Sequence, residues 1–289
     1  MMINLEKALL AICARNRDGS YSTQANRRAI LSLSARDLVQ LGFFNLSPLG
    51  LKPKHVEALV ERWRGQGLGV GTLKNRLAHL RWWAEKVNKA SVIARDNAHY
   101  GIENRVYVTN RSKALRVADE QLAKIKDERL RCSVELQRAF GLRREECLKF
   151  RPGYAIREDH ICLKPSWTKG GKARAVPIRN EAQRALLEKA KRLAGGGSMI
   201  PPELSYKAQL NRYTAAVAAA GLSKLHGLRH EYAQSRYQEL TGWLAPAVGG
   251  PSVKELSPLQ KAKDHQARLL VSRELGHERE QITATYLGR

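Results

Sequence analysis

Cysteine is scarce in this sequence, and its placement argues against two kinds of site. The four cysteines are Cys13, Cys132, Cys147 and Cys162, and no two of them form a Cys-x-x-Cys pair. Spacings of that kind are typical of zinc sites and of redox-active disulfides. We therefore expect neither kind of site, and we predict that the cysteines are reduced and behave as small buried hydrophobic residues.

A long hydrophobic run is also missing. The apolar stretch near the N-terminus, INLEKALLAICAR, is too short and too often interrupted by charge to cross a bilayer. It also lacks the pattern of a cleavable signal peptide. We therefore expect a cytoplasmic protein with no membrane partner.

Acidic residues are few compared with basic ones. Asp and Glu number 27 and Lys and Arg number 51, so the formal net charge is 51 − 27 = +24. This charge favours a polyanionic partner, with nucleic acid first and an anionic membrane surface second, although scattered surface charge would give the same total. The nearest approaches to a metal-binding carboxylate cluster are RREEC and REDH, and neither is convincing. We therefore expect no metal and no other cofactor.

Apolar residues recur at helical spacing through the first hundred residues. Helices are predicted over INLEKALLAICAR, from a capping Ser22 to Gly42, over KPKHVEALVERWRGQG and over GTLKNRLAHLRWWAEKVNK. The faces opposite the apolar stripes carry basic side chains, namely Arg62, Arg64, Lys74, Arg76, Arg81 and Lys86. Residues 1–100 are therefore predicted to form a helical DNA-binding domain.

The pattern changes after this domain. Residues 101–113 are interpreted as a linker, and residues 114–289 mix helices with strand-like stretches. YAIREDHICLKP alternates about a turn and predicts one hairpin, and SWTKGGKARAVPIR predicts another with a tight KGGK turn. Residues 241–258, rich in Gly and Pro, are interpreted as an inserted surface loop. The predicted fold class is mainly α with a small β-sheet (α+β).

Six side chains in the second half suit one chemistry. They are Arg143 in AFGLRREECL, Lys169 in TKGGKARAVPI, His226 and Arg229 in LHGLRHEYA, and His277 and Tyr286 in LGHEREQITATYLG. Guanidinium groups match the charge that gathers on phosphodiester oxygens in a transition state. A lysine can protonate a leaving alkoxide, a tyrosine can be a covalent nucleophile, and a histidine can accept its proton or hold a phosphate oxygen. The set is consistent with metal-free phosphodiester transfer.

Ordinary structural roles compete with these assignments. Lys172 lies in the same turn as Lys169 and could supply the proton instead. His230 follows His226 by four residues, but HGLRH lacks the glutamate of a zinc-binding HExxH motif, so His230 is interpreted as a packing or supporting residue. Glu146 either orients Arg143 or is a solvated helix charge.

Taken together, the motifs resemble those of the tyrosine recombinases, also called phage integrases. GLRREECL resembles the family's first arginine box, TKGGKARAVPI its β-hairpin lysine motif, HGLRHEYA its His-x-x-Arg box, and LGHEREQITATYLG its last box. The resemblance covers roughly residues 115–289 and implies that all six residues are catalytic, with Tyr286 as the nucleophile. It further implies that residues 1–100 are a core-binding (SAM-like) domain, and that 114–289 are the mixed α/β catalytic domain.

The resemblance implies a site-specific recombinase of a phage or integrative mobile element. Such an enzyme would form a C-shaped clamp on double-stranded attachment sites, cut through a 3′-phosphotyrosyl link without metal or ATP, and act as a homotetramer on two sites. It would work in a bacterial host, at the nucleoid when bound to DNA, with DNA-bending accessory proteins as further partners. Only three residues follow Tyr286, so we expect subunit contacts other than a long C-terminal segment. Two alternatives remain: religation of the same strand, as in type IB topoisomerases, and a catalytically inactive architectural DNA-binding protein.

Overall fold

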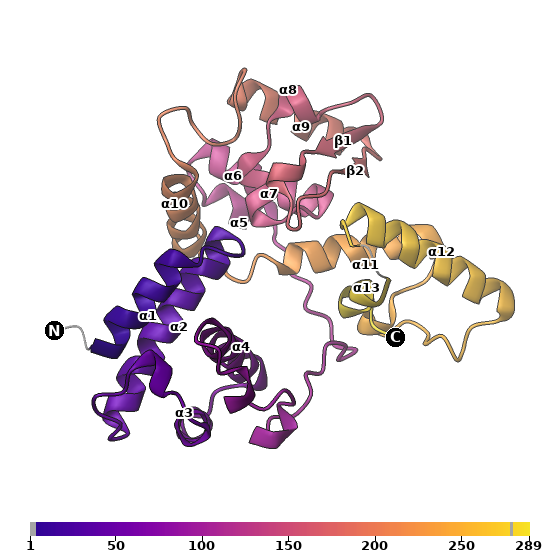
Figure 1. Cartoon of the computed structure of the whole chain (residues 1–289). Coiled ribbons are helices and arrows are strands. Elements are labelled where there is room, and N and C mark those ends of the chain that lie inside the picture. The colour runs from indigo at the N-terminus through magenta and orange to yellow at the C-terminus, as the bar shows by residue number, and fades with distance from the viewer. Residues whose placement is uncertain (1–3, 278–279) are drawn as a thin grey trace. The chain divides into compact units, whose positions relative to one another are not determined.

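The chain folds into two compact units that consist mostly of helices. The computed structural model describes residues 4–277 and 280–289. Residues Met1–Val106 form the first unit and Tyr107–Arg289 the second, so the division falls within the segment predicted as the linker. The described residues contain a single two-stranded sheet, in the second unit (Figure 1). The predicted fold class, mainly α with a small sheet, is confirmed.

The first unit, over its described residues 4–106, is built on four helices. They are α1 (Asn4–Arg15), α2 (Tyr21–Gln40), α3 (Pro53–Gly65) and α4 (Val70–Lys86), with single 3-10 turns at Pro48–Gly50, Ala90–Val92 and Ala98–Tyr100. The predicted cap at Ser22 is wrong. Ser20 caps α2, because its hydroxyl accepts a hydrogen bond from the backbone N–H of Thr23, whereas Ser22 lies inside the first turn. Gly42 follows the helix with φ +86°, as predicted for a glycine stop.

Large aromatic side chains fill the core of the first unit. Trp63 and Trp83 are fully buried and Trp82 is 9% exposed. Each indole N–H has an acceptor: Trp63 donates to Asp37 Oδ2 at 2.8 Å, and Trp82 donates to Asp18 Oδ2 at 3.0 Å. Buried aromatic rings with satisfied N–H groups contribute both apolar burial and a fixed orientation. The apolar stripes predicted from spacing are thus the core of this unit.

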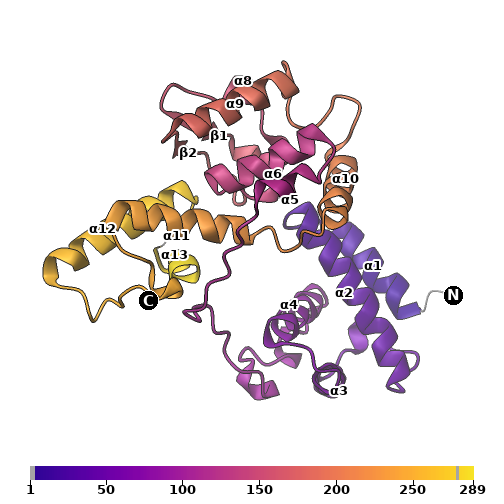
Figure 2. The ribbon, with the colours of Figure 1, turned by 180° about the vertical axis from the view of Figure 1, so that it is seen from behind.

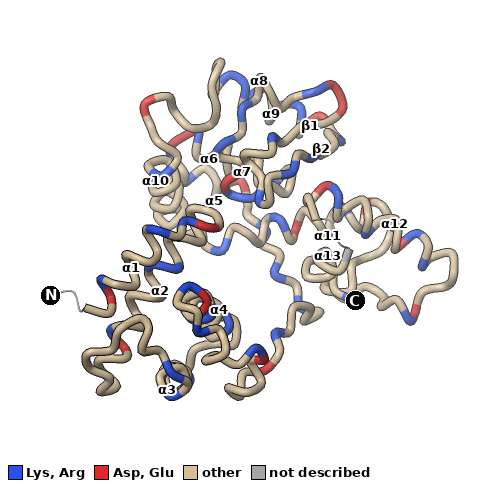
Figure 3. The backbone as a smooth tube through the Cα atoms, in the orientation of Figure 1, with Lys and Arg blue, Asp and Glu red and all other residues tan. Residues whose placement is uncertain are grey.

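The predicted basic face of the first unit is only partly free. Arg62 donates to Asp37, and Arg64 and Arg81 donate to the backbone carbonyls of Tyr100 and Ala94. Arg62 thus ties α3 to α2, whereas Arg64 and Arg81 tie their helices to the segment that follows α4, so all three also serve the fold. Figure 3 shows Lys and Arg distributed over both units, with Asp and Glu much sparser.

The second unit has nine helices among its described residues, apart from single 3-10 turns. They are α5 (Asp119–Ala123), α6 (Glu128–Phe140), α7 (Arg144–Lys149), α8 (Pro152–Ala155), α9 (Glu181–Ala194), α10 (Tyr206–Ala219), α11 (Gly227–Thr241), α12 (Pro258–Glu274) and α13 (Glu280–Leu287). The central helix α11 packs against α6, α12 and α13 (Figures 1 and 2). Three of the free cysteines are buried, as predicted, while Cys162 is half-buried.

The sheet corrects the predictions of both hairpins. Strand β1 (His160–Leu163) pairs antiparallel with β2 (Arg174–Pro177), with Ile161 opposite Val176. The first half of the second predicted hairpin is not a strand, because Pro165–Trp167 forms a 3-10 turn there. The KGGK turn therefore lies in a long connection between β1 and β2. The first predicted hairpin is reduced to one isolated bridge between Ile156 and Ile161.

Most of the predicted inserted loop, residues 242–257, connects α11 to α12 and contains one 3-10 turn at Pro246–Val248, whereas residues 241 and 258 belong to the helices. Ala245 is fully buried, and the Trp243 indole donates to the Tyr237 hydroxyl at 3.1 Å. A Cβ on Gly250 would lie 1.7 Å from the carbonyl oxygen of Leu244, so only glycine fits this close approach. The loop is therefore packed on the second unit and not merely appended to it.

Candidate active site

The hydroxyl of Tyr286 lies between a histidine and an arginine from α11. Tyr286 is on α13 and is 7% exposed. Its hydroxyl is 3.3 Å from His226 Nε2 and 3.4 Å from Arg229 Nε. Its backbone carbonyl accepts a hydrogen bond from Gln234 at 2.9 Å, and its ring centroid is 4.4 Å from that of His230. Tyrosine and its two neighbours are thus held within one unit of one chain.

The start of α11 brings His226 and Arg229 to this position. His226 precedes the first helical residue, Gly227, and Arg229 follows within the first turn. A Cβ on Gly227 would come within 2.8 Å of the Lys113 carbonyl oxygen and 2.6 Å of Leu115 Cβ. Glycine therefore lets the incoming segment 113–115 pack directly on the helix start, where Leu115 N–H donates to the Gly227 carbonyl at 3.0 Å.

Two arginines from distant parts of the sequence converge on one oxygen. Arg229 is fully buried and donates through Nη1 to the Gly141 carbonyl at 2.5 Å and through Nη2 to the Leu275 carbonyl. Arg143 Nη2 donates to the same Leu275 oxygen at 3.3 Å. Burial, with the charge of Arg143 second, lowers the pKa of Arg229 to about 10, so it stays charged at neutral pH. The site therefore holds two adjacent cations, a suitable arrangement for a phosphodiester.

A buried carboxylate holds the first of these arginines. Glu146 has no exposed surface, and it accepts hydrogen bonds from the Arg143 backbone N–H at 2.7 Å and from Arg143 Nη1 at 2.8 Å. Arg174 donates to both Glu146 oxygens, each at 2.6 Å. Burial alone would raise the pKa of Glu146, but the hydrogen bonds and charge of Arg174, aided by Arg229 and Arg143, lower it to about 2. The interpretation of Glu146 as a solvated charge is wrong.

Sequence reasoning missed Arg174. The sequence feature that could have identified Arg174 is the two-residue period of a strand. This period places Arg174 on the same strand face as buried Val176. An arginine on an otherwise buried strand face requires an internal partner, which here is Glu146.

The histidines of the site are held neutral. Burial, followed by the charges of Arg229 and Arg143, lowers the pKa of His226, and burial with Arg229 next lowers that of His277 to about 3. Burial, with His226 second, lowers the pKa of His230 to about 4. His277 Nε2 is 3.5 Å from Arg229 Nη2, and its ring centroid is 5.3 Å from that of Tyr286. His230 packs on the tyrosine ring, in keeping with a supporting role.

Lys169 stands apart from the other five predicted residues. It is exposed in the connection between β1 and β2, and forms no hydrogen bond or ion pair with any residue that the structure describes. The turn around it is closed by Gly171 N–H to the Thr168 carbonyl at 3.2 Å, and by the Thr168 hydroxyl to the Lys172 carbonyl at 2.6 Å. The structure thus brings Arg143, His226, Arg229, His277 and Tyr286 together and leaves the lysine on a surface turn.

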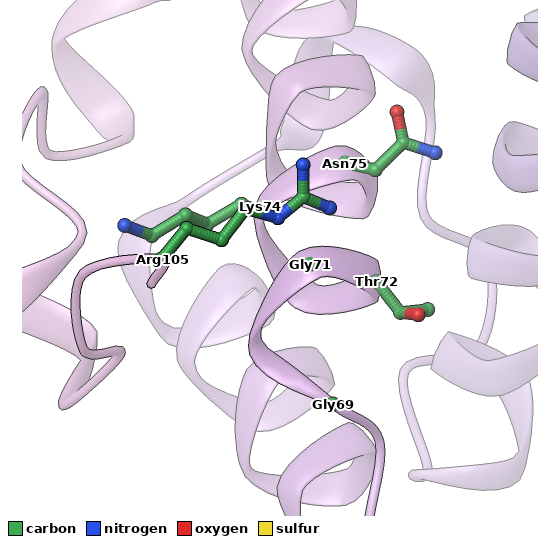
Figure 4. Close-up of a pocket in the computed structure, with 6 residues that line it drawn as sticks. All are labelled: Gly69, Gly71, Thr72, Lys74, Asn75 and Arg105. Atoms are coloured by element: carbon green, nitrogen blue, oxygen red, sulfur yellow. The ribbon is translucent and has the colours of Figure 1, made fainter. Parts of the chain in front are cut away.

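The first unit carries a separate basic pocket of about 570 Å³ at the start of α4. Its lining residues are Gly69, Gly71, Thr72, Lys74, Asn75 and Arg105 (Figure 4). A Cβ on Gly71 would lie 2.0 Å from Arg105 Nη2, so glycine gives the arginine its place beside the helix. Lys74 Nζ contacts Asn104 Oδ1 at 3.2 Å. The pocket presents the cations Lys74 and Arg105 beside a helix start, an arrangement that suits an anion.

In the described part of the chain, no group of three or more His, Cys, Asp and Glu side chains is placed to hold a metal ion. None of the helices in this described part is long and apolar enough to cross a membrane.

Two family models match the sequence. Residues 2–90 match the model described as phage integrase, N-terminal, and residues 104–235 match the one described as integrase. A comparison with curated proteins gave no match.

Solved structures share the fold over almost the whole chain. A lambda integrase dimer bound to a COC′ core site matches with a TM-score of 0.61 and 18% identity, covering 100% of this chain and 97% of that one. XerH recombinase in a post-cleavage complex with palindromic difH matches with a TM-score of 0.61 and 18% identity, covering 98% of this chain and 81% of that one. The Tn1549 transposon integrase with circular intermediate DNA matches with a TM-score of 0.58 and 13% identity, covering 99% of this chain and 96% of that one. With both parts of the sequence matched by integrase models and the fold shared throughout, this chain belongs to the phage integrase family of tyrosine recombinases.

Proposed function

We propose that the chain is a site-specific recombinase that cuts and rejoins DNA with Tyr286 as its nucleophile. The observation that carries this proposal is the placement of the tyrosine hydroxyl, 3.3 Å from His226 Nε2 and 3.4 Å from Arg229 Nε. A neutral imidazole and a guanidinium at one hydroxyl are the two groups needed to remove its proton and to bind the phosphate that it attacks.

The reaction divides among the residues as follows. His226 accepts the hydroxyl proton while the Tyr286 oxygen bonds to the scissile phosphorus. The bond to the 5′ oxygen breaks, leaving a 3′-phosphotyrosyl link, and Lys169 donates a proton to the departing 5′ oxygen. Arg143 and Arg229 bind the non-bridging oxygens through the charge that builds on them.

His277 binds the phosphate in this proposal, and the phosphotyrosyl link stores the energy for rejoining. The neutral ring of His277, 3.5 Å from Arg229, is suited to a hydrogen bond with a phosphate oxygen. The energy of the phosphodiester is retained in the link to tyrosine. A 5′ hydroxyl from a partner duplex can therefore attack the link and reverse the chemistry without ATP or metal.

The tyrosine acts within its own subunit in this account. Its helix α13 packs on α11 and α12 of the same chain, and Asn110 holds the residues beyond it through two hydrogen bonds to the Arg289 backbone. Cleavage in cis follows if the DNA-bound protein keeps these contacts.

Double-stranded attachment DNA is the substrate in this proposal, and the two units share its binding. The basic pocket of Lys74 and Arg105 would bind a backbone phosphate, and the second unit would hold the scissile one. Related structures include a lambda integrase tetramer bound to a Holliday junction. A homotetramer clamped on two sites, assisted by DNA-bending proteins at the nucleoid of a bacterial host, is the corresponding assembly here.

Strand transfer to a second duplex tests recombination against simple religation. Duplexes selected from a random pool by binding to the protein would be nicked near the bound site and incubated in EDTA. An unnicked partner duplex of different length is then added. A hybrid strand of new length is the expected product. Resealing of the original strand alone, with no hybrid, would contradict recombination and favour a topoisomerase-like activity.

A further inference from the structure

Arg174 joins two parts of the candidate active site that lie far apart in the sequence. From β2, its Nη1 and Nη2 each donate to an oxygen of Glu146 at 2.6 Å, and its Nε donates to the carbonyl of Glu274 at 3.0 Å. Its side chain is only 5% exposed. One guanidinium therefore connects the first turn of α7 with the last turn of α12.

We propose that Arg174 is a positioning residue for strand cleavage, holding Arg143 through Glu146 and holding His277 through the turn that follows α12. The inference rests on the proposed function, since it gives a task in that reaction to a residue that touches none of the reacting atoms.

The contact with Arg143 is indirect but tightly specified. Glu146 Oε1 accepts from Nη1 of both Arg143 and Arg174, and Oε2 accepts from the Arg143 backbone N–H and from Arg174 Nη2. Each carboxylate oxygen is thus shared between the two arginines. Loss of Arg174 would leave a buried carboxylate with half of its donors, and such a group relaxes its geometry or takes up a proton.

The contact with His277 runs through the backbone. Gly276 has φ +65°, and a Cβ there would lie 2.8 Å from Arg174 Cδ, so the turn packs directly on the arginine stem. The His277 backbone N–H then donates to the Ser272 carbonyl at 2.9 Å. The Arg174 bond to Glu274 fixes the start of this turn, and the turn directs the histidine toward Arg229.

The charges around Glu146 make the proposal testable by pH. The charged groups that face it are Arg174 from β2, Arg143 from the start of α7 and Arg229 from α11, and the thiol of Cys147 follows it on its own helix. Burial opposes its ionisation, and Arg174 is the foremost group that favours it. Without Arg174, we expect the pKa of Glu146 to rise from about 2 toward the neutral range.

Single-turnover formation of the covalent adduct, measured on nicked duplex from pH 5 to 8, is the experiment. We expect Arg174→Gln to slow adduct formation on the order of 100-fold, as for a misplaced catalytic group, with DNA affinity retained. Its rate should decrease toward acid pH more steeply than that of wild type, because Glu146 then takes up a proton. The double variant Arg174→Gln/Glu146→Gln should be slow at every pH, but without this additional decrease.

Two further variants make the experiment decisive. Arg179→Gln removes an arginine that is 17% exposed and paired with Glu239 outside the site, and this variant should react like wild type. Arg174→Lys retains the positive charge. Its rate of adduct formation, and the decrease of that rate toward acid pH, should lie between those of wild type and Arg174→Gln. If Arg174→Gln does not fold, as judged by circular dichroism, Arg174→Lys carries the test.

The outcomes separate the two proposals. A wild-type protein that binds DNA but forms no adduct contradicts the proposed function itself. A reactive wild type with an equally fast Arg174→Gln, or Arg174→Lys where that carries the test, overturns the positioning role. So does a variant that is slow but has a pH profile parallel to wild type, because a purely structural loss would not create a new titration.

Discussion

Acidification should destabilise the second unit through His230, because this residue is buried in its neutral form. The ring is 5% exposed and packs at 4.4 Å on Tyr286. Burial, then the charges of His226, Lys113 and Arg229, lowers the pKa of His230 to about 4. In the unfolded chain the pKa of histidine is near 6.5. Between this pH and about pH 4, the unfolded state therefore binds a proton that the folded state does not bind.

The size of the effect follows from these two pKa values. The pKa of His230 is lower in the folded state than in the unfolded state. Its neutral form therefore contributes fully to stability above about pH 6.5, and this contribution is lost progressively as the pH falls toward 4. At pH 5 the unfolded histidine is almost fully protonated and the folded one is mostly neutral. Linkage then gives a loss of about 2 kcal/mol in the free energy of unfolding.

The full chain would be equilibrated in urea at each pH and then exposed to a short hydrogen-exchange pulse at one fixed pH. Exchange in peptides of α11 then reports the free energy of unfolding of the second unit. The matched variant is His230→Phe, which keeps a ring on Tyr286 but cannot titrate. Wild type should lose about 2 kcal/mol more than the variant between pH 7.5 and pH 5. The other histidines titrate in both proteins and cancel in this difference. Equal losses in the two proteins would refute the reasoning.

Other expectations concern catalysis and packing. Lys169→Ala should slow cleavage on the order of 100- to 10,000-fold. The rate of this variant should recover on DNA with sulfur at the 5′ leaving position, since a thiolate leaves without a proton. If Lys172→Ala is the variant that recovers, Lys172 is the proton donor instead. Trp63→Ala should cost the first unit about 3–5 kcal/mol by urea unfolding, and a loss under 1 kcal/mol would contradict its core role. Asn110→Ala removes both bonds to Arg289 and should speed hydrogen exchange in α13, whereas unchanged exchange would show that the C-terminal residues are held by other contacts.

Helical elements could be predicted because periodicity is local information. Leu59, Trp63 and Leu77, from the predicted apolar stripes, are fully buried in the first unit. The exact cap could not be fixed, because Ser20 and Ser22 both suit an N-terminus and only the backbone selects one. The second hairpin failed for a similar reason, since Pro165 begins a 3-10 turn that alternation alone does not indicate.

The candidate site was predictable as a set of residues but not as a network. Ordered motifs indicated Arg143, Arg229 and Tyr286, and the structure brings them together. Arg174 escaped because its importance depends on a carboxylate 28 positions earlier and a helix end 100 positions later. Sequence spacing carries no direct signal for such contacts, although a charged residue on a buried strand face is a useful warning.

The central claim is that Tyr286 forms a covalent link to DNA, and covalent trapping tests it most directly. Wild type and Tyr286→Phe would be incubated in EDTA with a nicked duplex that both bind, and denaturing gels would separate protein joined to DNA. We predict an adduct for wild type and none for the variant, with equal DNA affinity. An adduct that survives Tyr286→Phe would contradict the assignment of the nucleophile, and tight binding with no adduct in either protein would contradict the proposed reaction.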